Sequence, residues 1–101
     1  MISPSMPPSA SDYRCCCDEH ALIEETIEQC VFADEMGWDY VWFVEHHFLT
    51  GFSGSPCPEV LLGALSQRTK NIRLGFGVSI LPYHHPVRVA ERVAMIDQLT
   101  N

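Results

Sequence analysis

Residues 40–47, YVWFVEHH, decide the fold of this chain. The first five are β-branched or aromatic without a polar interruption, which predicts a short strand buried on both faces. Glu45, His46 and His47 follow at the point where that strand should end. The stretch therefore predicts a buried strand with ionisable side chains at its carboxyl end.

The flanking sequence alternates between helical and strand patterns. Residues 18–37 place apolar side chains at helical spacing, with acidic residues at the start and a glycine after the last turn. Residues 58–70 predict a second helix that begins at a proline and ends with basic residues. Residues 72–80 alternate with the period of a strand, and residues 86–99 return to helical spacing. This order predicts right-handed βαβ crossovers and a parallel sheet, which is an α/β fold.

The composition is that of a globular protein with excess negative charge. The chain has 101 residues, 47% of them hydrophobic, and its 6 Lys and Arg against 13 Asp and Glu give a net charge of −7. Negative charge repels phosphate backbones and anionic lipids, which disfavours nucleic acid and membrane as partners. No apolar run approaches the roughly 20 residues that cross a bilayer, and the start does not resemble a signal peptide. We therefore expect a cytoplasmic protein.

The first 17 residues differ from the rest. Three prolines among the first eight positions, interleaved with serines, resist helix and strand alike. We expect residues 1–17 to be a disordered or aberrant leader and residues 18–101 to be the folded part. The cysteines, an odd number that suits no complete disulfide framework, should stay reduced in the cytosol: Cys15, Cys16, Cys17, Cys30 and Cys57. The adjacent run among them lacks the spacing of a zinc site, so we expect no metal there.

Several short blocks of the sequence occur in the order found in a known family. They are ADEMGWD (33–39) with VW (41–42), EHHF (45–48), RT (68–69) with IRLG (72–75), LP (81–82) with HPVR (85–88), and Glu91 before DQL (97–99). Together these blocks resemble the bacterial-luciferase-like flavin-dependent monooxygenases, from about residue 18 to residue 101. Each block is weak alone, but their shared order makes coincidence a poor explanation.

The resemblance implies a TIM (β/α)8 barrel, of which this chain would supply only the early βα units. A complete barrel has eight strands and typically about 250 residues. Relatives begin with a first strand that the sequence of residues 1–17 does not resemble, so we expect that strand to be missing or replaced. The resemblance also implies reduced FMN as cosubstrate, or a deazaflavin as in some relatives. Molecular oxygen would be the oxidant, and an aldehyde or other small organic molecule the substrate.

The polar residues after the first predicted strand are the expected catalytic group. Active sites of parallel barrels lie at the carboxyl ends of the strands. By resemblance His46 would be the catalytic base, because imidazole titrates near neutral pH and a neighbouring carboxylate can orient or charge it. His47 would support His46, and Glu45 would join the site or pair with an arginine elsewhere in the barrel. Without the family resemblance, the simpler explanation of His46 and His47 would be a packed histidine pair or a pair in a surface loop.

The second predicted strand carries the expected cofactor contacts. Gly75 and Gly77 leave one of its faces nearly bare, which lets a flat ring system approach the backbone. In luciferases the corresponding strand end lies beside the flavin ring, and the matching positions here are Phe76 and Gly77. Tight packing in the barrel interior is the alternative explanation for the glycines.

His84 and His85 follow that strand. A metal site that joins them to His46 and His47 is an alternative, since imidazole is a common ligand of zinc and iron. Adjacent histidines seldom converge on one ion, so we expect no metal. We expect His85 and Pro86 to shape the loop and to start the third helix.

The sequence therefore predicts a fragment of a flavin-dependent monooxygenase whose parent protein is an enzyme and whose isolated form is inactive. Two alternatives remain. One is a non-catalytic truncated remnant, whose sheet would have open edges. The other is a subunit that pairs with a complete barrel, because members of this family often dimerise.

Overall fold

The computed structural model describes residues 19–49 and 53–100. The elements in chain order are α1 (Glu19–Glu35), β1 (Tyr40–Phe43), α2 (Pro58–Leu65), β2 (Arg73–Phe76), the 3-10 helix η2 (Leu81–Tyr83) and α3 (Pro86–Thr100). The predicted order of helices and strands is confirmed, and η2 is an addition that the sequence patterns did not indicate. The expected leader, residues 1–17, lies outside the described residues.

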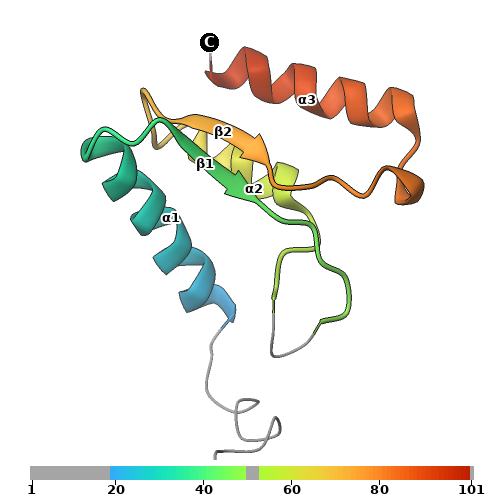
Figure 1. The fold of residues 1–101 in the computed structure, drawn as a ribbon, viewed down its shortest axis with the longest axis horizontal. Helices are drawn as coiled ribbons and strands as arrows, with labels where there is room; N and C mark the ends of the chain where they lie inside the picture. The colour runs from blue at the N-terminus through green and yellow to red at the C-terminus, as the bar shows by residue number, and fades with distance from the viewer. Residues whose placement is uncertain (1–18, 50–52, 101) are drawn as a thin grey trace, which may run out of the picture.

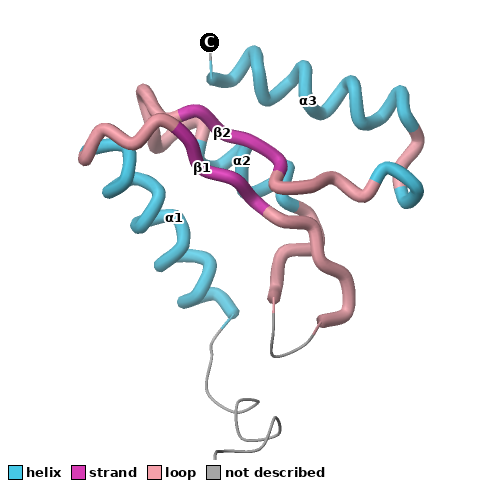
Figure 2. The backbone as a smooth tube through the Cα atoms, in the orientation of Figure 1, coloured by secondary structure: helices cyan, strands magenta, loops and turns pink. Residues whose placement is uncertain are grey.

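The two strands form a parallel pair (Figure 1). Tyr40 lies opposite Arg73, and the register continues to Phe43 opposite Phe76. Among the described residues β1 and β2 are the whole sheet. Because both strands run in one direction, the loops that leave their carboxyl ends lie next to each other (Figure 2).

The hydrophobic core lies on one face of this sheet. Ile27 and Cys30 of α1 and Leu65 of α2 are buried together. Val41 and Phe43 of β1 pack against them. The alternation of side chains along a strand places residues 40 and 42 on the opposite face.

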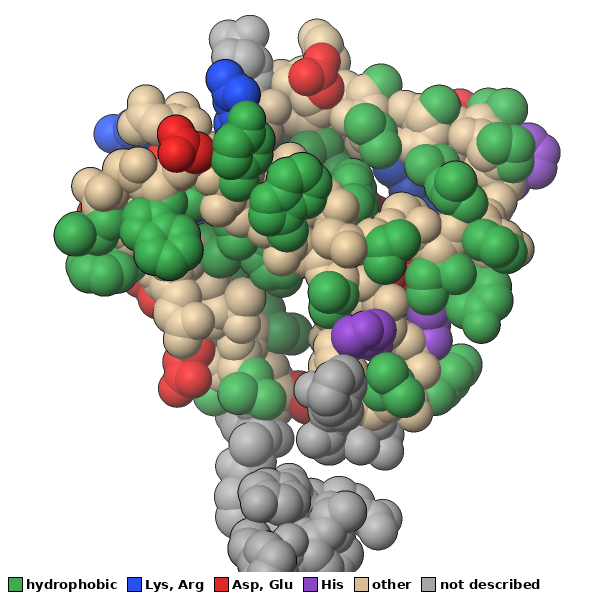
Figure 3. All heavy atoms as spheres, viewed as in Figure 1, with side chains coloured by type: hydrophobic (Ala, Val, Ile, Leu, Met, Phe, Trp, Pro, Cys, Tyr) green, Lys and Arg blue, Asp and Glu red, His purple; other side chains and the backbone are tan. Residues whose placement is uncertain are grey.

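The opposite face is open, which corrects the expectation of a strand buried on both faces. The side chains of Tyr40 and Trp42 are 46% and 62% exposed, because α1 and α2 pack on the other side. This face is turned to the viewer in Figure 3, where hydrophobic side chains gather over the strands. The Tyr40 and Trp42 rings stack with centroids 5.9 Å apart.

Glycine and proline mark the helix ends where the sequence predicts them. Gly37 adopts a φ of 80° directly after α1, a conformation that glycine tolerates at a helix end. Pro58 and Pro86 begin α2 and α3, where a missing backbone N–H costs nothing. The basic residues Arg68 and Lys70, expected in the last turn of α2, instead lie beyond its end at Leu65.

A buried carboxylate ties α1 to the segment before β2. Asp34 accepts hydrogen bonds from the backbone N–H groups of Lys70, Asn71 and Ile72 at 2.8, 2.8 and 2.7 Å. Burial alone would raise the pKa of Asp34, but these three donors and the nearby Lys70 charge outweigh burial, so its pKa is lowered. Asp34 therefore stays ionised and fixes where β2 begins.

The second strand is shorter than the alternating pattern predicts. It ends at Phe76, and the last cross-strand bond runs from Gly77 N to Phe43 O at 2.6 Å. The backbone N–H of Ile80 donates to the Glu45 side chain instead of to a neighbouring strand. A competing carboxylate therefore bends residues 78–80 out of the sheet.

Helix α3 contacts α2 and has no buried residue. Arg92 of α3 pairs with Glu59 of α2 at 2.8 Å, and Gln67 donates to the Leu99 carbonyl at 3.4 Å. A groove of about 490 Å³ separates α3 from α2 and β2. Within residues 19–49 and 53–100, no helix is both long and apolar enough to span a bilayer.

Candidate active site

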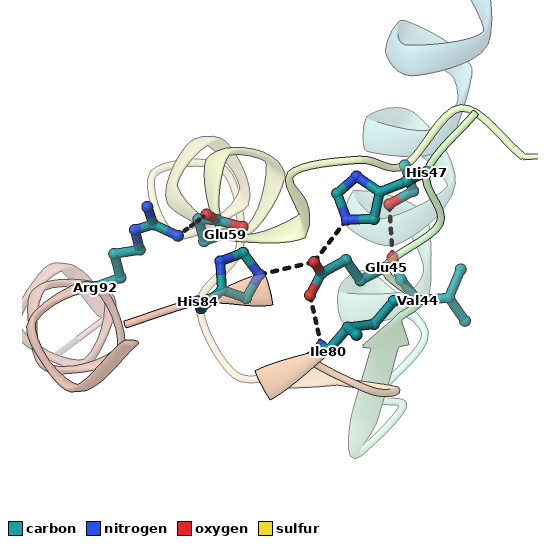
Figure 4. Close-up of polar contacts among 8 residues, drawn as sticks. Val44, Glu45, His47, Glu59, Ile80, His84 and Arg92 are labelled. Carbon is teal, nitrogen blue, oxygen red and sulfur yellow. Dashed lines mark hydrogen bonds and ion pairs between the residues drawn. The ribbon is translucent and has the colours of Figure 1, made fainter. Parts of the chain in front are cut away.

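Glu45 is the centre of a hydrogen-bonded cluster at the carboxyl ends of the strands (Figure 4). It lies two residues beyond the end of β1, and its side chain is only 1% exposed. Its Oε1 atom accepts from Nε2 of His47 and from Nε2 of His84, each at 2.7 Å. Its Oε2 atom accepts from the backbone N–H of Ile80, also at 2.7 Å. The cluster therefore joins the end of β1 to the loop that follows β2.

The Glu45 carboxylate is ionised at neutral pH despite its burial. Burial alone would raise its pKa, but the hydrogen bonds from His47, Ile80 and His84 outweigh burial and lower the pKa of Glu45 to about 2. An ionised carboxylate only accepts hydrogen bonds, so each contacting imidazole must carry a hydrogen on Nε2. The Nδ1 atom of each neutral ring then holds a lone pair that can take up a proton.

The structure brings Glu45 and His47 together, with His46 between them in the chain. The backbone N–H of His46 donates to the Ser55 carbonyl at 2.9 Å, and the Ser55 hydroxyl donates to the Val44 carbonyl at 2.7 Å. These two bonds hold the end of β1 against the segment before α2. Glu45 pairs with the imidazoles of His47 and His84. The sequence had also allowed an arginine elsewhere in the barrel as its partner.

His84 is the member of the cluster that the sequence analysis missed. The sequence indicated His84 only as a possible metal ligand and gave the loop-shaping role to His85 and Pro86, of which Pro86 begins α3. The signal was present: residues that follow two adjacent parallel strands meet at one edge of the sheet. Within the described ranges no three His, Cys, Asp or Glu side chains are placed to hold a metal ion. The two Nε2 atoms contact Glu45 at hydrogen-bond distance instead.

The expected cofactor residues lie on two different faces of β2. Gly75 and Gly77 share the open face with Trp42, whereas Phe76 lines the hollows between β2 and the helices α2 and α3. A Cβ atom added at Gly75 would lie 2.5 Å from Cε3 of Trp42, so the indole already fills that space. At Gly77 an added Cβ would come close only to the Phe43 backbone and to Cβ of Trp42, at 3.2 Å or more. Packing thus accounts for Gly75, and the surface above Gly77 remains open.

Gly75→Ala is expected to lower the free energy of unfolding by about 1 to 2 kcal/mol, because the new methyl group displaces the Trp42 indole. Near-ultraviolet circular dichroism should show loss of the Tyr40–Trp42 stack, and urea unfolding gives the free energy. Gly63→Ala is the matched control, since nothing lies within 4 Å of its added Cβ and alanine favours helix α2. The control should gain about 0.5 kcal/mol. Equal behaviour of the two variants would contradict the packing explanation.

Glu45 should also give the protein a specific sensitivity to acid. Its pKa is about 2 in the fold against a reference value of 4.5, so its stabilising effect is complete above pH 4.5 and is lost as the pH falls toward about 2. Glu45→Gln should remove this part of the decline, measured by urea unfolding at a series of acidic pH values. Glu24→Gln, on the exposed surface of α1, should keep the wild-type decline. A wild-type decline in Glu45→Gln would mean that Glu45 is not the responsible group.

Comparison with known proteins shows the family of the chain. The family model for luciferase-like monooxygenases matches residues 8–101. The chain is 38% identical over 88 residues to limonene 1,2-monooxygenase of Rhodococcus erythropolis. The aligned region covers 87% of this chain and 22% of that protein. The chain is 40% identical over 74 residues to 4-hydroxyprotoasukamycin monooxygenase of Streptomyces nodosus subsp. asukaensis, covering 73% of this chain and 20% of that protein.

A solved structure shows the same arrangement of elements. It is the oxygenating constituent of 3,6-diketocamphane monooxygenase, a type II Baeyer-Villiger monooxygenase from the CAM plasmid of Pseudomonas putida, in complex with FMN. The TM-score is 0.78 at 27% identity, over 96% of this chain and 24% of that chain. The chain thus spans about a quarter of that protein and less of the two sequence relatives, which fits an α/β part of a barrel. The family resemblance drawn from the short sequence blocks is confirmed, and the chain belongs to the luciferase-like monooxygenase family.

Proposed function

We propose that this chain forms part of the active-site wall of a cytoplasmic flavin-dependent monooxygenase. The parent protein would use reduced FMN and molecular oxygen to oxidise a small organic molecule such as an aldehyde. The observation that carries the proposal is the Glu45 cluster. It is a buried, ionised carboxylate that holds two imidazoles at the carboxyl ends of parallel strands, where barrel enzymes place their chemistry.

The described residues fit a flat ring at Gly77 better than at Gly75. The open face at Gly77 lies one strand away from the end of β1, which carries Glu45, His46 and His47. Flavin contact at Gly77, and with the backbone of Phe76, remains part of the proposal. Contact at Gly75 would require the Trp42 indole to move. Reduced flavin, when bound, supplies the electrons that activate dioxygen.

His46 is proposed as the base that moves a proton during the reaction, with Glu45 and His47 as its supports. The backbone of His46 is fixed at the end of β1 by its bond to Ser55, which limits the positions that its ring can reach. Glu45 holds His47 in one tautomer beside it. A base near neutral pH on a fixed backbone is suited to proton transfer at a defined place.

The substrate is proposed to be a small organic molecule and the flavin to be FMN. The relatives include a limonene 1,2-monooxygenase and a 3,6-diketocamphane monooxygenase, so an aldehyde is one candidate among small organic molecules. FMN is favoured over a deazaflavin because the matched solved structure contains FMN.

A second candidate function is a non-catalytic chain, either a truncated remnant or a subunit that pairs with a complete barrel. The open face of the sheet favours this candidate, because large exposed apolar surfaces mark interaction sites or unstable fragments. Tyr40 and Trp42 lie on that face, and the described sheet has two strands with open edges.

Oxygen uptake by the natural polypeptide that carries these residues separates these candidates. FMN and a flavin reductase would be supplied with panels of aldehydes, ketones and terpenes. The proposal expects oxygen uptake and product only when reduced FMN and a substrate are both present. Turnover with a reduced deazaflavin alone would replace the FMN assignment. Absence of turnover, with co-purification of a complete barrel protein, would establish the pairing subunit instead.

A further inference from the structure

We propose that His84 is a second proton-holding residue of this site, coupled to His47 through Glu45, so that the cluster binds one proton at a time. This inference rests on the proposed function for its role in catalysis. The arrangement itself rests on the geometry around one carboxylate oxygen.

Both imidazoles contact the same atom of Glu45. His47 Nε2 and His84 Nε2 each lie 2.7 Å from Oε1, and the Ile80 N–H occupies Oε2. The two rings therefore share one negative charge at one oxygen. The side chains of His47 and His84 are 26% and 17% exposed, and that of Glu45 is 1% exposed. Solvent therefore screens the interaction between the rings and the carboxylate only weakly.

The shared charge sets the number of protons that the cluster can hold. With both rings neutral, the cluster has a charge of −1. One added proton, on Nδ1 of either ring, makes an imidazolium whose charge Glu45 balances, and the cluster becomes neutral. A second proton would leave an unbalanced positive charge in a mostly buried place, which is costly. Uptake on one ring therefore opposes uptake on the other.

The two rings lie on different sides of Glu45 (Figure 4). His47 packs edge-on against Tyr83, with ring centroids 5.3 Å apart, beside the loop that leaves β1. His84 instead lines a small hollow of about 30 Å³ between α2 and α3. This volume is large enough for one water molecule. A proton held by the pair could thus be exchanged from either side of the carboxylate.

Other charged groups near His84 do not upset this balance. Glu59 of α2 and Arg92 of α3 line the same hollow and pair with each other at 2.8 Å. Their charges cancel, so Glu45 is the uncompensated carboxylate that faces the two rings. Tyr83 is a further titratable neighbour, and it contacts His47 through its ring. His46 and His85 are the titratable chain neighbours of the two rings.

Nuclear magnetic resonance of the whole chain with nitrogen-15 in its imidazoles tests the proposal. At mildly alkaline pH, His47 and His84 should both carry hydrogen on Nε2 and none on Nδ1. On acidification to mildly acidic pH, the two rings together should take up one proton. In Glu45→Gln the pair should no longer take up this proton at mildly acidic pH, because the negative charge that balances the imidazolium is gone.

Two variants keep the test decisive. His84→Gln can still donate to Glu45, so the fold should persist while His47 alone binds the single proton. His85→Gln, at the exposed neighbour, should leave the behaviour of His47 and His84 unchanged. Three results would overturn the proposal: hydrogen on Nδ1 of His84 at mildly alkaline pH, uptake of two protons by the wild-type pair, or titration like an unfolded peptide. The measurement needs no flavin, so its failure is distinguishable from a failure of the proposed oxygenase function.

Discussion

Asp34→Ala is expected to lower the free energy of unfolding by about 4 kcal/mol. The change removes the acceptor of three backbone N–H groups at once, those of Lys70, Asn71 and Ile72. Ile72 is buried, so water cannot replace the lost acceptor at that residue. The segment before β2 would lose its attachment to α1, and the pairing of β2 with β1 would weaken. Urea unfolding followed by circular dichroism gives the free energy.

Glu35→Ala is the matched control for this change. Glu35 is the next residue of α1 and is exposed, so its loss should change the free energy by less than about 0.5 kcal/mol. The pKa of Asp34 is lowered in the fold, so its contribution should be present at neutral pH and should decline in acid as the carboxylate is protonated. A loss no greater than that of the control would show that Asp34 does not anchor the segment.

His46→Ala is expected to slow substrate oxidation by roughly 100-fold to 1,000-fold in the natural polypeptide, while flavin affinity stays near the wild-type value. The proposed base would be absent, whereas Gly77 and the open face of the sheet would be unchanged. The rate is measured as product formed per unit time at saturating reduced FMN, and affinity by fluorescence titration of FMN.

The histidine in the loop after η2 provides the control for this prediction. His85→Gln keeps a polar side chain at an exposed position and should retain most of the rate. Loss of flavin binding in His46→Ala would assign His46 to cofactor binding. An unchanged rate would remove it from the chemistry.

The elements of the fold could be predicted because their signals are local. Gly37 supplies a conformation that other residues resist, and Pro58 and Pro86 are prolines at helix starts. Spacing of apolar residues then gave the kind of element between these points. The same local signals predicted the end of β2 wrongly. The backbone N–H of Ile80 donates to the carboxylate of Glu45, which lies 35 residues earlier, and not to a neighbouring strand.

The site could be predicted only as far as one strand end. Glu45, His46 and His47 are adjacent in the sequence, so their common place follows from a single strand. The contact of His84 with Glu45 joins residues 39 positions apart, and it depends on the strand register and the path of the loop through η2. The same register places Trp42 over Gly75, which no pattern within one strand reveals.

The sequence also predicted that β1 is more buried than it is, again because residues outside the strand decide its burial. A continuous apolar run predicts coverage on both faces, but it does not say which residues supply that coverage. Tyr40 and Trp42 remain exposed because the described helices pack on one face of the sheet.

Oxygen-18 labelling tests most directly whether this chain belongs to a working monooxygenase. The natural polypeptide would be supplied with reduced FMN, an accepted substrate and oxygen-18 dioxygen, and the product would be analysed by mass spectrometry. We expect one labelled atom per product molecule, with no labelled product when flavin is omitted. Product oxygen that comes from water, or labelled product formed equally without flavin, would contradict this expectation.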